Sequence, residues 1–318
     1  MDIKRKIIYL DQFAASIMSE ESPKEHWGEA KELLLKAYSE NKIICPIPLE
    51  NFIETVERRS SEAIKENNFI ISLSGNKCFK CWEEIVVGEI INIVKGCNKE
   101  IIPATYLMDR KPSMDLKNEV FLRNVKTAKA EYEKCICKEK RDINTFRDMI
   151  KACGNNAKDY YPGYMEKALI SIFAKKYESF FLDVVNGSYE LPDLLSFQYP
   201  KKTLLGILLK QSGMCRTDFL SIANIFKNYG FETIPSLNTY YKLEAKFAAD
   251  QSKEIKNDDI DLKRISSGIA ISDIMFVDSK QKRRLQSLKL DSQYNTILFS
   301  DLQGDVVAFV DILRNLMK

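Results

Sequence analysis

Histidine is almost absent from this chain, because His26 is the only one among 318 residues. A Ser-His-Asp triad could at most be built around this one residue, and an acid/base ribonuclease with two histidines is excluded. His26 lies between Glu25 and Trp27 in a polar helical stretch, so we interpret it as a surface residue. Any catalytic chemistry must therefore come mainly from other side chains.

The chain also lacks a long apolar run and a large net charge. No run of apolar residues is long enough to span a bilayer, and residues 1–6 lead into a strand without the shape of a signal peptide. We therefore expect a cytoplasmic protein without a membrane partner, whose eight cysteines are reduced thiols. A net charge of +3 is too small to indicate a nucleic-acid binder, so such a role needs locally clustered charge.

Four short apolar segments have the composition of strands that are buried on both faces of a parallel sheet. They are residues 7–10, 43–45, 274–277 and 296–299. Helical spacing separates the first two, and another helix begins near Leu49, after the second. The order strand, helix, strand, helix implies parallel strands joined by right-handed crossovers, so the sequence predicts an α/β fold.

The middle of the chain is mostly helical by its apolar spacing. Helices are expected at residues 83–94, 165–181, 202–211, 218–228 and 240–249, within an otherwise amphipathic region that includes 115–150. Residues 69–73 are expected to be extended before a turn at 74–76, and Thr217 is expected to cap the helix that follows it. A last helix is expected at 305–317.

These patterns divide the chain into two parts. Residues 1–66 and 255–318 are predicted to form an α/β core, and residues 67–254 a large helical insertion. The insertion holds no acidic set of its own at strand ends. We expect it to pack on the core and to contact a second copy of the chain or a regulatory partner.

Aspartates follow three of the predicted strands: Asp11, Asp278 and, after Ser300, Asp301. The carboxyl ends of parallel strands border the crevice in which α/β proteins bind ligands, so these aspartates indicate a carboxylate-lined site. A second interpretation is structural, because aspartate is also common in turns and at the first position of helices.

Two helices supply further carboxylates. Asp261 stands at the start of a helix, and Glu50 and Glu54 lie one turn apart on the helix that begins near Leu49. Carboxylates without a histidine or thiol among them suit Mg²⁺ or Mn²⁺, and a cation relieves their mutual repulsion. Position on the helical wheel favours Glu50 over Glu54, because Glu50 lies nearer the buried stripe.

Three segments together resemble the PIN-like nucleases. IIYLDQF at residues 7–13 resembles the opening strand with its first catalytic aspartate, and CPIPLENFIET at 45–55 resembles the element that supplies a glutamate. DIDLKRISSGIAISDIMFVDSK at 259–280 resembles the helix-starting aspartate and the strand that ends in another. The resemblance covers residues 1–66 and 255–318 and is closest to bacterial PIN-like proteins of phage defence and abortive infection. Phe13 and Pro48 depart from the pattern, which leaves the substrate open.

The resemblance implies a PIN-like three-layer core with a parallel sheet and a metal-dependent endonuclease, with RNA favoured over DNA. It implies that four acids hold one or two Mg²⁺ or Mn²⁺ ions: Asp11, Glu54, Asp261 and Asp278. Glu54 matches because Thr55 follows it, which makes Glu50 and Asp301 supporting carboxylates. Hydrolysis would leave a 5′-phosphate, and the biological role would be phage defence or that of a toxin-like effector. The alternative is a PIN-like subunit that has lost catalysis and binds nucleic acid or takes part in an assembly.

Two weaker signals accompany the acids. A basic run follows Asp278 and consists of Lys280, Lys282, Arg283 and Arg284. It could hold a nucleic-acid backbone, or it could be the solvated start of a helix. Four cysteines, Cys78, Cys81, Cys135 and Cys137, could together bind zinc, although Cys135 lies in an amphipathic stretch where a cysteine is more often a small core residue.

Overall fold

The computed structural model divides the chain into two compact units. It describes residues 5–23, 25–55, 60–97, 101–112, 114, 118–121, 123–127, 130, 163–192, 200–250 and 258–318. The first unit, called the sheet unit, comprises Met1–Cys81, Ile101–Lys126 and Ser267–Lys318. The second, called the helical unit, comprises Trp82–Glu100 and Thr127–Ser266.

A four-stranded parallel sheet organises the sheet unit. Its strands are β1 (Lys6–Leu10), β2 (Ile43–Ile44), β5 (Ile274–Phe276) and β6 (Ile297–Phe299), in the order β2-β1-β5-β6. Leu10 is the register partner of Phe276, which is in turn the partner of Phe299. The α/β class and the parallel sheet are thereby confirmed.

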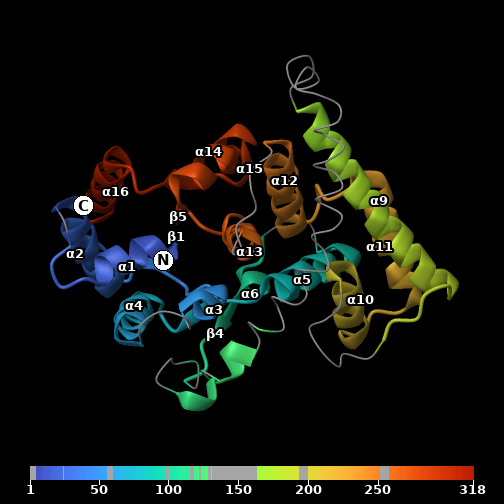
Figure 1. The fold of residues 1–318 in the computed structure, drawn as a ribbon, viewed down its shortest axis with the longest axis horizontal. Coiled ribbons are helices and arrows are strands. Elements are labelled where there is room, and N and C mark those ends of the chain that lie inside the picture. The colour runs from blue at the N-terminus through green and yellow to red at the C-terminus, as the bar shows by residue number, and fades with distance from the viewer. Residues whose placement is uncertain are drawn as a thin grey trace. The chain divides into compact units, whose positions relative to one another are not determined.

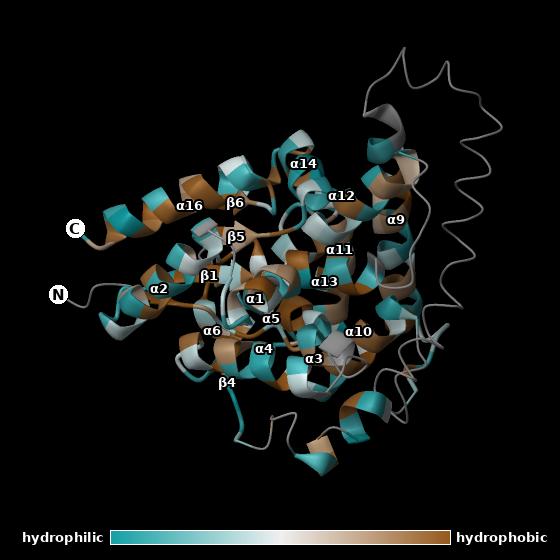
Figure 2. Ribbon diagram, turned by 60° about the vertical axis from the view of Figure 1, so that its left-hand side comes forward, coloured by the Kyte–Doolittle hydropathy of each residue, from teal (hydrophilic) through white to brown (hydrophobic). Residues whose placement is uncertain are grey.

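Helices surround this sheet. They are α1 (Gln12–Ser19), α2 (Glu25–Ser39), α3 (Glu50–Thr55), α4 (Ser60–Leu73), α14 (Ser279–Ser287), α15 (Leu290–Tyr294) and α16 (Gln303–Leu316). In Figure 1, α16 at the C-terminus lies beside α2, and the two helices contact each other. Figure 2 shows α16 with both hydrophobic and hydrophilic residues, and its buried side chains Phe309 and Leu313 belong to the core together with Phe276.

A small antiparallel pair completes the sheet unit. It consists of β3 (Lys77–Phe79) and β4 (Leu107–Asp109), and the short helix α6 (Pro103–Tyr106) directly precedes β4. The predicted turn at 74–76 is present, with positive φ at Gly75 and Asn76. The expectation of an extended segment at 69–73 is wrong, because these residues form the last turns of α4. Phe69, Ile70 and Leu73 are buried at helical spacing, so packing outweighs the strand preference of the run.

Helices alone build the described part of the helical unit. They are α5 (Trp82–Val94), α9 (Tyr164–Asn186), α10 (Lys201–Gln211), α11 (Arg216–Tyr229), α12 (Pro235–Ala249) and α13 (Asp258–Gly268), the last of which continues into the sheet unit. Figure 1 shows α11 beside α9, and stacked aromatic rings such as Phe181 and Phe226 fill this contact. The cap of α11 is Cys215 with Asp218 rather than the expected Thr217, because the Asp218 carboxylate accepts the Cys215 N–H at 2.7 Å.

The predicted amphipathic stretch at 115–150 falls largely outside the described residues. Among the helices that are described, none combines the length and the apolar character that crossing a bilayer requires.

Candidate functional site

Two of the predicted acidic residues lie at the same edge of the sheet. β1 and β5 are parallel neighbours that end at the register partners Leu10 and Phe276, so Asp11 and Asp278 both follow the carboxyl ends of these strands. The backbone N–H of Asp11 donates to the carbonyl of Phe276 at 3.3 Å. Neighbouring strands lie only about 4.8 Å apart, so the sheet brings the two positions together. We call this region the carboxyl edge.

Both aspartates also cap helices, as the structural interpretation predicted. Oδ1 of Asp11 accepts the Gln12 N–H at 2.6 Å and caps α1. Oδ1 of Asp278 accepts the N–H groups of Lys280 and Gln281 at 2.8 and 2.9 Å and caps α14. A carboxylate offers about four lone pairs, so capping and ligand binding are compatible. For Asp278, every hydrogen bond to a described residue is made by Oδ1, which leaves Oδ2 for a ligand.

Gln281 adds an oxygen at this edge that the sequence analysis missed. Its side chain is 3% exposed, and Oε1 finds no hydrogen-bond donor among the described residues. Amide oxygens are hard ligands of the same kind as carboxylates. Its position three residues after Asp278 is that of a capping-box glutamine, but its Oε1 does not accept the N–H of Asp278, so sequence reasoning would have given it a structural role. A buried acceptor without a donor is costly, and a ligand at this edge would offset that cost.

The third strand end carries a polar triplet centred on Asp305. Lys282 donates to both carboxylate oxygens of Asp305 at 2.7 Å, and the Ser300 hydroxyl donates to Oδ2 at 2.5 Å. Burial acts to raise the pKa of Asp305, but the hydrogen bonds from Lys282 and Ser300 outweigh it and hold the pKa below its usual value. Asp301, the predicted acid at this position, is exposed. Asp305 could have been found from its place in the first turn of α16.

The four basic residues that follow Asp278 lie on different faces of α14, so some are exposed and others are buried. Lys280 and Arg283 are exposed, with Arg283 Nε donating to the carbonyl of Ser279 at 3.1 Å. Lys282 is held by Asp305, and Arg284 is only 5% exposed. The charge that this segment offers to solvent therefore comes from Lys280 and Arg283.

Of the two candidate glutamates of α3, the structure describes the side chain of Glu50 alone. Glu50 is the first residue of α3 and is buried. Glu54 lies in the last turn of the same helix, but its side chain falls outside the described part of the chain. The choice between the two glutamates stays a prediction.

Asp261, the remaining predicted acid, belongs to the helical unit. It forms an ion pair with Arg264 one turn later on α13, and Arg264 is itself buried. The charge of Asp261 is therefore partly neutralised within its own helix.

A buried ion network lies beside it in the helical unit. Lys263 Nζ donates to Glu83 at 2.6 Å and lies 5.4 Å from the centre of the Trp82 ring. Asp259 pairs with Lys201 at 3.2 Å. Burial alone would lower the pKa of Lys263, but Glu83 and Asp259 raise it above its usual value. Such a network fixes α13 against α5 and the start of α10.

Within the described ranges, no group of three histidine, cysteine, aspartate or glutamate side chains is arranged to hold a metal ion. Of the four cysteines considered for zinc, Cys135 and Cys137 lie outside those ranges. Burial raises the pKa of Cys78 to about 12, against the opposing charge of Arg110. Cys78 is therefore a neutral thiol near pH 7, and the thiolate that zinc requires is disfavoured there.

Comparison with known proteins gives no further guide, since no family model, no curated protein and no solved structure matches the chain.

Proposed function

We propose that this protein is a metal-dependent endonuclease that cleaves RNA in preference to DNA. The observation that carries the proposal is the pair Asp11 and Asp278, which leave neighbouring parallel strands at the carboxyl edge. Ligands of open α/β sheets bind at this edge. The order of the segments that resemble PIN-like nucleases supports the same conclusion, and with it a PIN-like three-layer core.

The donor atoms at the carboxyl edge fit a hard divalent cation. Asp11 and Asp278 supply carboxylates and Gln281 supplies an amide oxygen without a donor, so the set consists of oxygen alone. By the resemblance, Glu54 and Asp261 complete the ligands of Mg²⁺ or Mn²⁺. A bound ion of this kind activates a water molecule and stabilises the charge on a phosphodiester.

The chain's own residues contribute substrate binding and orientation. Lys280 and Arg283 present exposed positive charge on the first two turns of α14, directly after Asp278. Such charges bind phosphates and position a strand without reading its sequence. Asp278 holds the N-terminus of α14, so the same residue fixes these cations relative to the carboxyl edge. By the resemblance, the protein acts in the cytoplasm in phage defence or as a toxin-like effector.

A second candidate function is a PIN-like subunit without catalysis that binds nucleic acid or takes part in an assembly. The observation that favours it is that the acids already have structural partners. Asp11 and Asp278 cap helices, and Asp261 is paired with Arg264. These roles would persist in a protein that had lost the metal.

Cleavage assays separate the two functions. End-labelled RNA and DNA are incubated with the protein in Mn²⁺ or in excess chelator, and Asp278→Asn is compared with Asp311→Asn, a matched change at an exposed position of α16. We expect cleavage of RNA in Mn²⁺ that is lost with chelator and in Asp278→Asn but is retained in Asp311→Asn. Cleavage that survives the chelator would refute the proposal, and RNA binding without cleavage would favour the subunit.

A further inference from the structure

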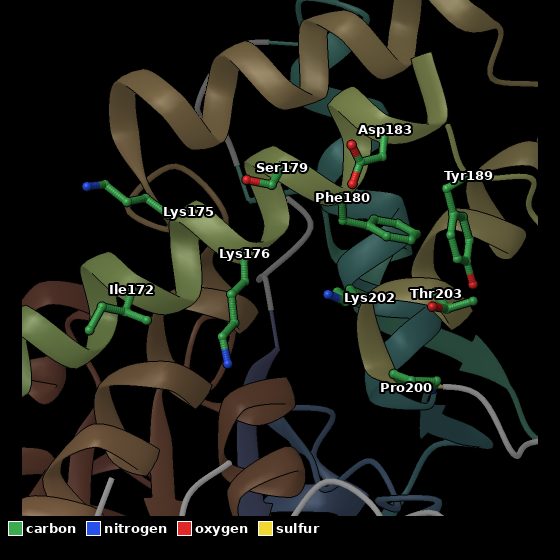
Figure 3. Close-up of a pocket in the computed structure, with 10 residues that line it drawn as sticks. All are labelled: Ile172, Lys175, Lys176, Ser179, Phe180, Asp183, Tyr189, Pro200, Lys202 and Thr203. Atoms are coloured by element: carbon green, nitrogen blue, oxygen red, sulfur yellow. The ribbon is translucent and has the colours of Figure 1, made fainter. Parts of the chain in front are cut away.

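A pocket of about 530 Å³ lies in the helical unit between α9 and the start of α10 (Figure 3). Its volume is in the range of small-molecule binding sites. Side chains of α9, of the segment after it and of the first turn of α10 line it, among them Lys175, Phe180, Tyr189, Lys202 and Thr203. None of these residues belongs to the carboxyl edge.

The lining carries an excess of positive charge. It contains Lys175, Lys176 and Lys202 but a single carboxylate, that of Asp183. Among the described residues, neither Lys175 nor Lys202 has an ion-pair partner, whereas the adjacent Lys201 pairs with Asp259. The Lys202 ammonium lies 5.7 Å from the centre of the Phe180 ring. The pocket is therefore suited to an anion.

The N-terminus of α10 adds to this preference. Its cap is Pro200, which makes no side-chain hydrogen bond to the first turn. The N–H groups of a first turn have no partner within the helix, and together with the helix dipole they attract anions. Thr203 in the same turn is only 3% exposed and lines the pocket. Its hydroxyl can donate a hydrogen bond to a polar ligand in the pocket.

An aromatic surface completes the pocket. Tyr189 is 39% exposed and packs edge-on against Phe180, with ring centres 5.4 Å apart. Gly206 allows this packing, because a Cβ there would lie 2.8 Å from Leu191 and 3.1 Å from Phe180. In Figure 3, Tyr189 and Thr203 lie on the same side of the pocket. An exposed ring beside an anion site offers a stacking surface for a nucleobase.

We propose that this pocket binds a nucleoside phosphate. Lys202, Thr203 and the N-terminus of α10 hold the phosphate, and Tyr189 packs against the base. The ligand is either a free nucleotide or the phosphorylated 5′ end of an RNA strand, since both present the same groups. The inference does not depend on the proposed nuclease function, because none of its residues is a proposed metal ligand.

Calorimetric titration of the full chain tests this, with AMP, ATP, adenosine and inorganic phosphate as probes. Excess chelator is present throughout, so that divalent cations play no part. We expect saturable binding of AMP or ATP that is tighter than that of adenosine or of phosphate alone. Lys202→Gln and Thr203→Val should each weaken it, the former by about tenfold, as expected for the loss of a hydrogen bond to a charged group. Lys210→Gln, at the exposed far end of α10, should leave it unchanged.

Further titrations with RNA identify the source of the phosphate. A short RNA with a 5′-phosphate is compared with the same RNA without it. Tighter binding of the phosphorylated RNA than of AMP, lost in Lys202→Gln, would identify an RNA end, and the reverse order would identify a free nucleotide. Absence of saturable binding for every probe would overturn the proposal. So would affinities that are unchanged in both Lys202→Gln and Thr203→Val, or equally lowered in Lys210→Gln. None of these results depends on cleavage activity.

Discussion

Asp305 illustrates at the residue scale how a carboxylate at the carboxyl edge stabilises the fold. Its pKa is lowered in the folded protein, so its contribution to stability is complete above the ordinary carboxyl pKa of about 4 and is lost as the pH falls through the folded value. Asp305→Asn should therefore cost about 1 kcal/mol at pH 7 and less at pH 3, as measured by urea unfolding. Lys282→Met should reduce this pH dependence and leave the part that is due to Ser300. A cost for Asp305→Asn that is equal at both pH values would contradict this assignment.

The two glutamates of α3 give the second prediction at this scale. The family pattern selects Glu54 as the ligand, whereas the helical wheel and the burial of Glu50 favour Glu50. We expect Glu54→Gln to abolish Mn²⁺-dependent cleavage and Glu50→Gln to lower it only in part, when Mn²⁺ is titrated against the cleavage rate. The reverse outcome, with Glu50→Gln inactive and Glu54→Gln near the normal rate, would show that burial was the better guide.

Single residues of the carboxyl edge could be predicted to different degrees. Asp11 and Asp278 were accessible to sequence reasoning, because a buried strand that ends in aspartate is a local pattern. Asp305 was missed although it begins the predicted last helix, because only the turn from β6 into α16 shows that it, and not Asp301, pairs with Lys282 and Ser300. Arg284 was also missed as a buried residue, because the phase of α14 against the sheet decides which cations are exposed.

At the scale of elements, α12 depends on a carboxylate from a distant helix. Glu89 of α5 accepts the backbone N–H and the hydroxyl of Ser236, in the first turn of α12, with the hydroxyl at 2.8 Å. Glu89→Ala leaves this N–H without an acceptor and removes a negative charge from the helix N-terminus, so we expect a loss of about 2 kcal/mol in urea unfolding. Glu84→Ala, at an exposed position of the same helix, should cost less than about 0.5 kcal/mol. Equal stability of the two variants would refute the capping role.

The elements that sequence reasoning found are those with strong local signals. The helices α9 and α11 and the strands β1 and β5 follow from apolar spacing and composition. The end of α4 was assigned as extended because its apolar run is short, and only packing distinguishes a buried helix turn from a buried strand. The pair β3 and β4 was missed because its partners are far apart in the chain.

At the scale of the whole molecule, the exposed cations after Asp278 should dominate the salt dependence of RNA binding. Lys280→Ala combined with Arg283→Ala should make the slope of log affinity against log salt shallower by about 1.4 for single-stranded RNA, measured with chelator present. Lys36→Ala, on the exposed side of α2, is the control and should change the slope little. An unchanged slope in the double variant would show that this segment is only a solvated helix surface.

The central claim is that the carboxyl edge holds a divalent cation, and Mn²⁺ binding followed by electron paramagnetic resonance tests it most directly. Asp278→Asn is a suitable variant, because asparagine caps a helix about as well as aspartate and the fold should be retained. The account predicts saturable Mn²⁺ binding that weakens at least about tenfold in Asp278→Asn and in Asp11→Asn, as expected when a charged ligand is lost, and is unchanged in Asp311→Asn. Absence of saturable binding, or equal affinity in wild type and Asp278→Asn, would contradict it.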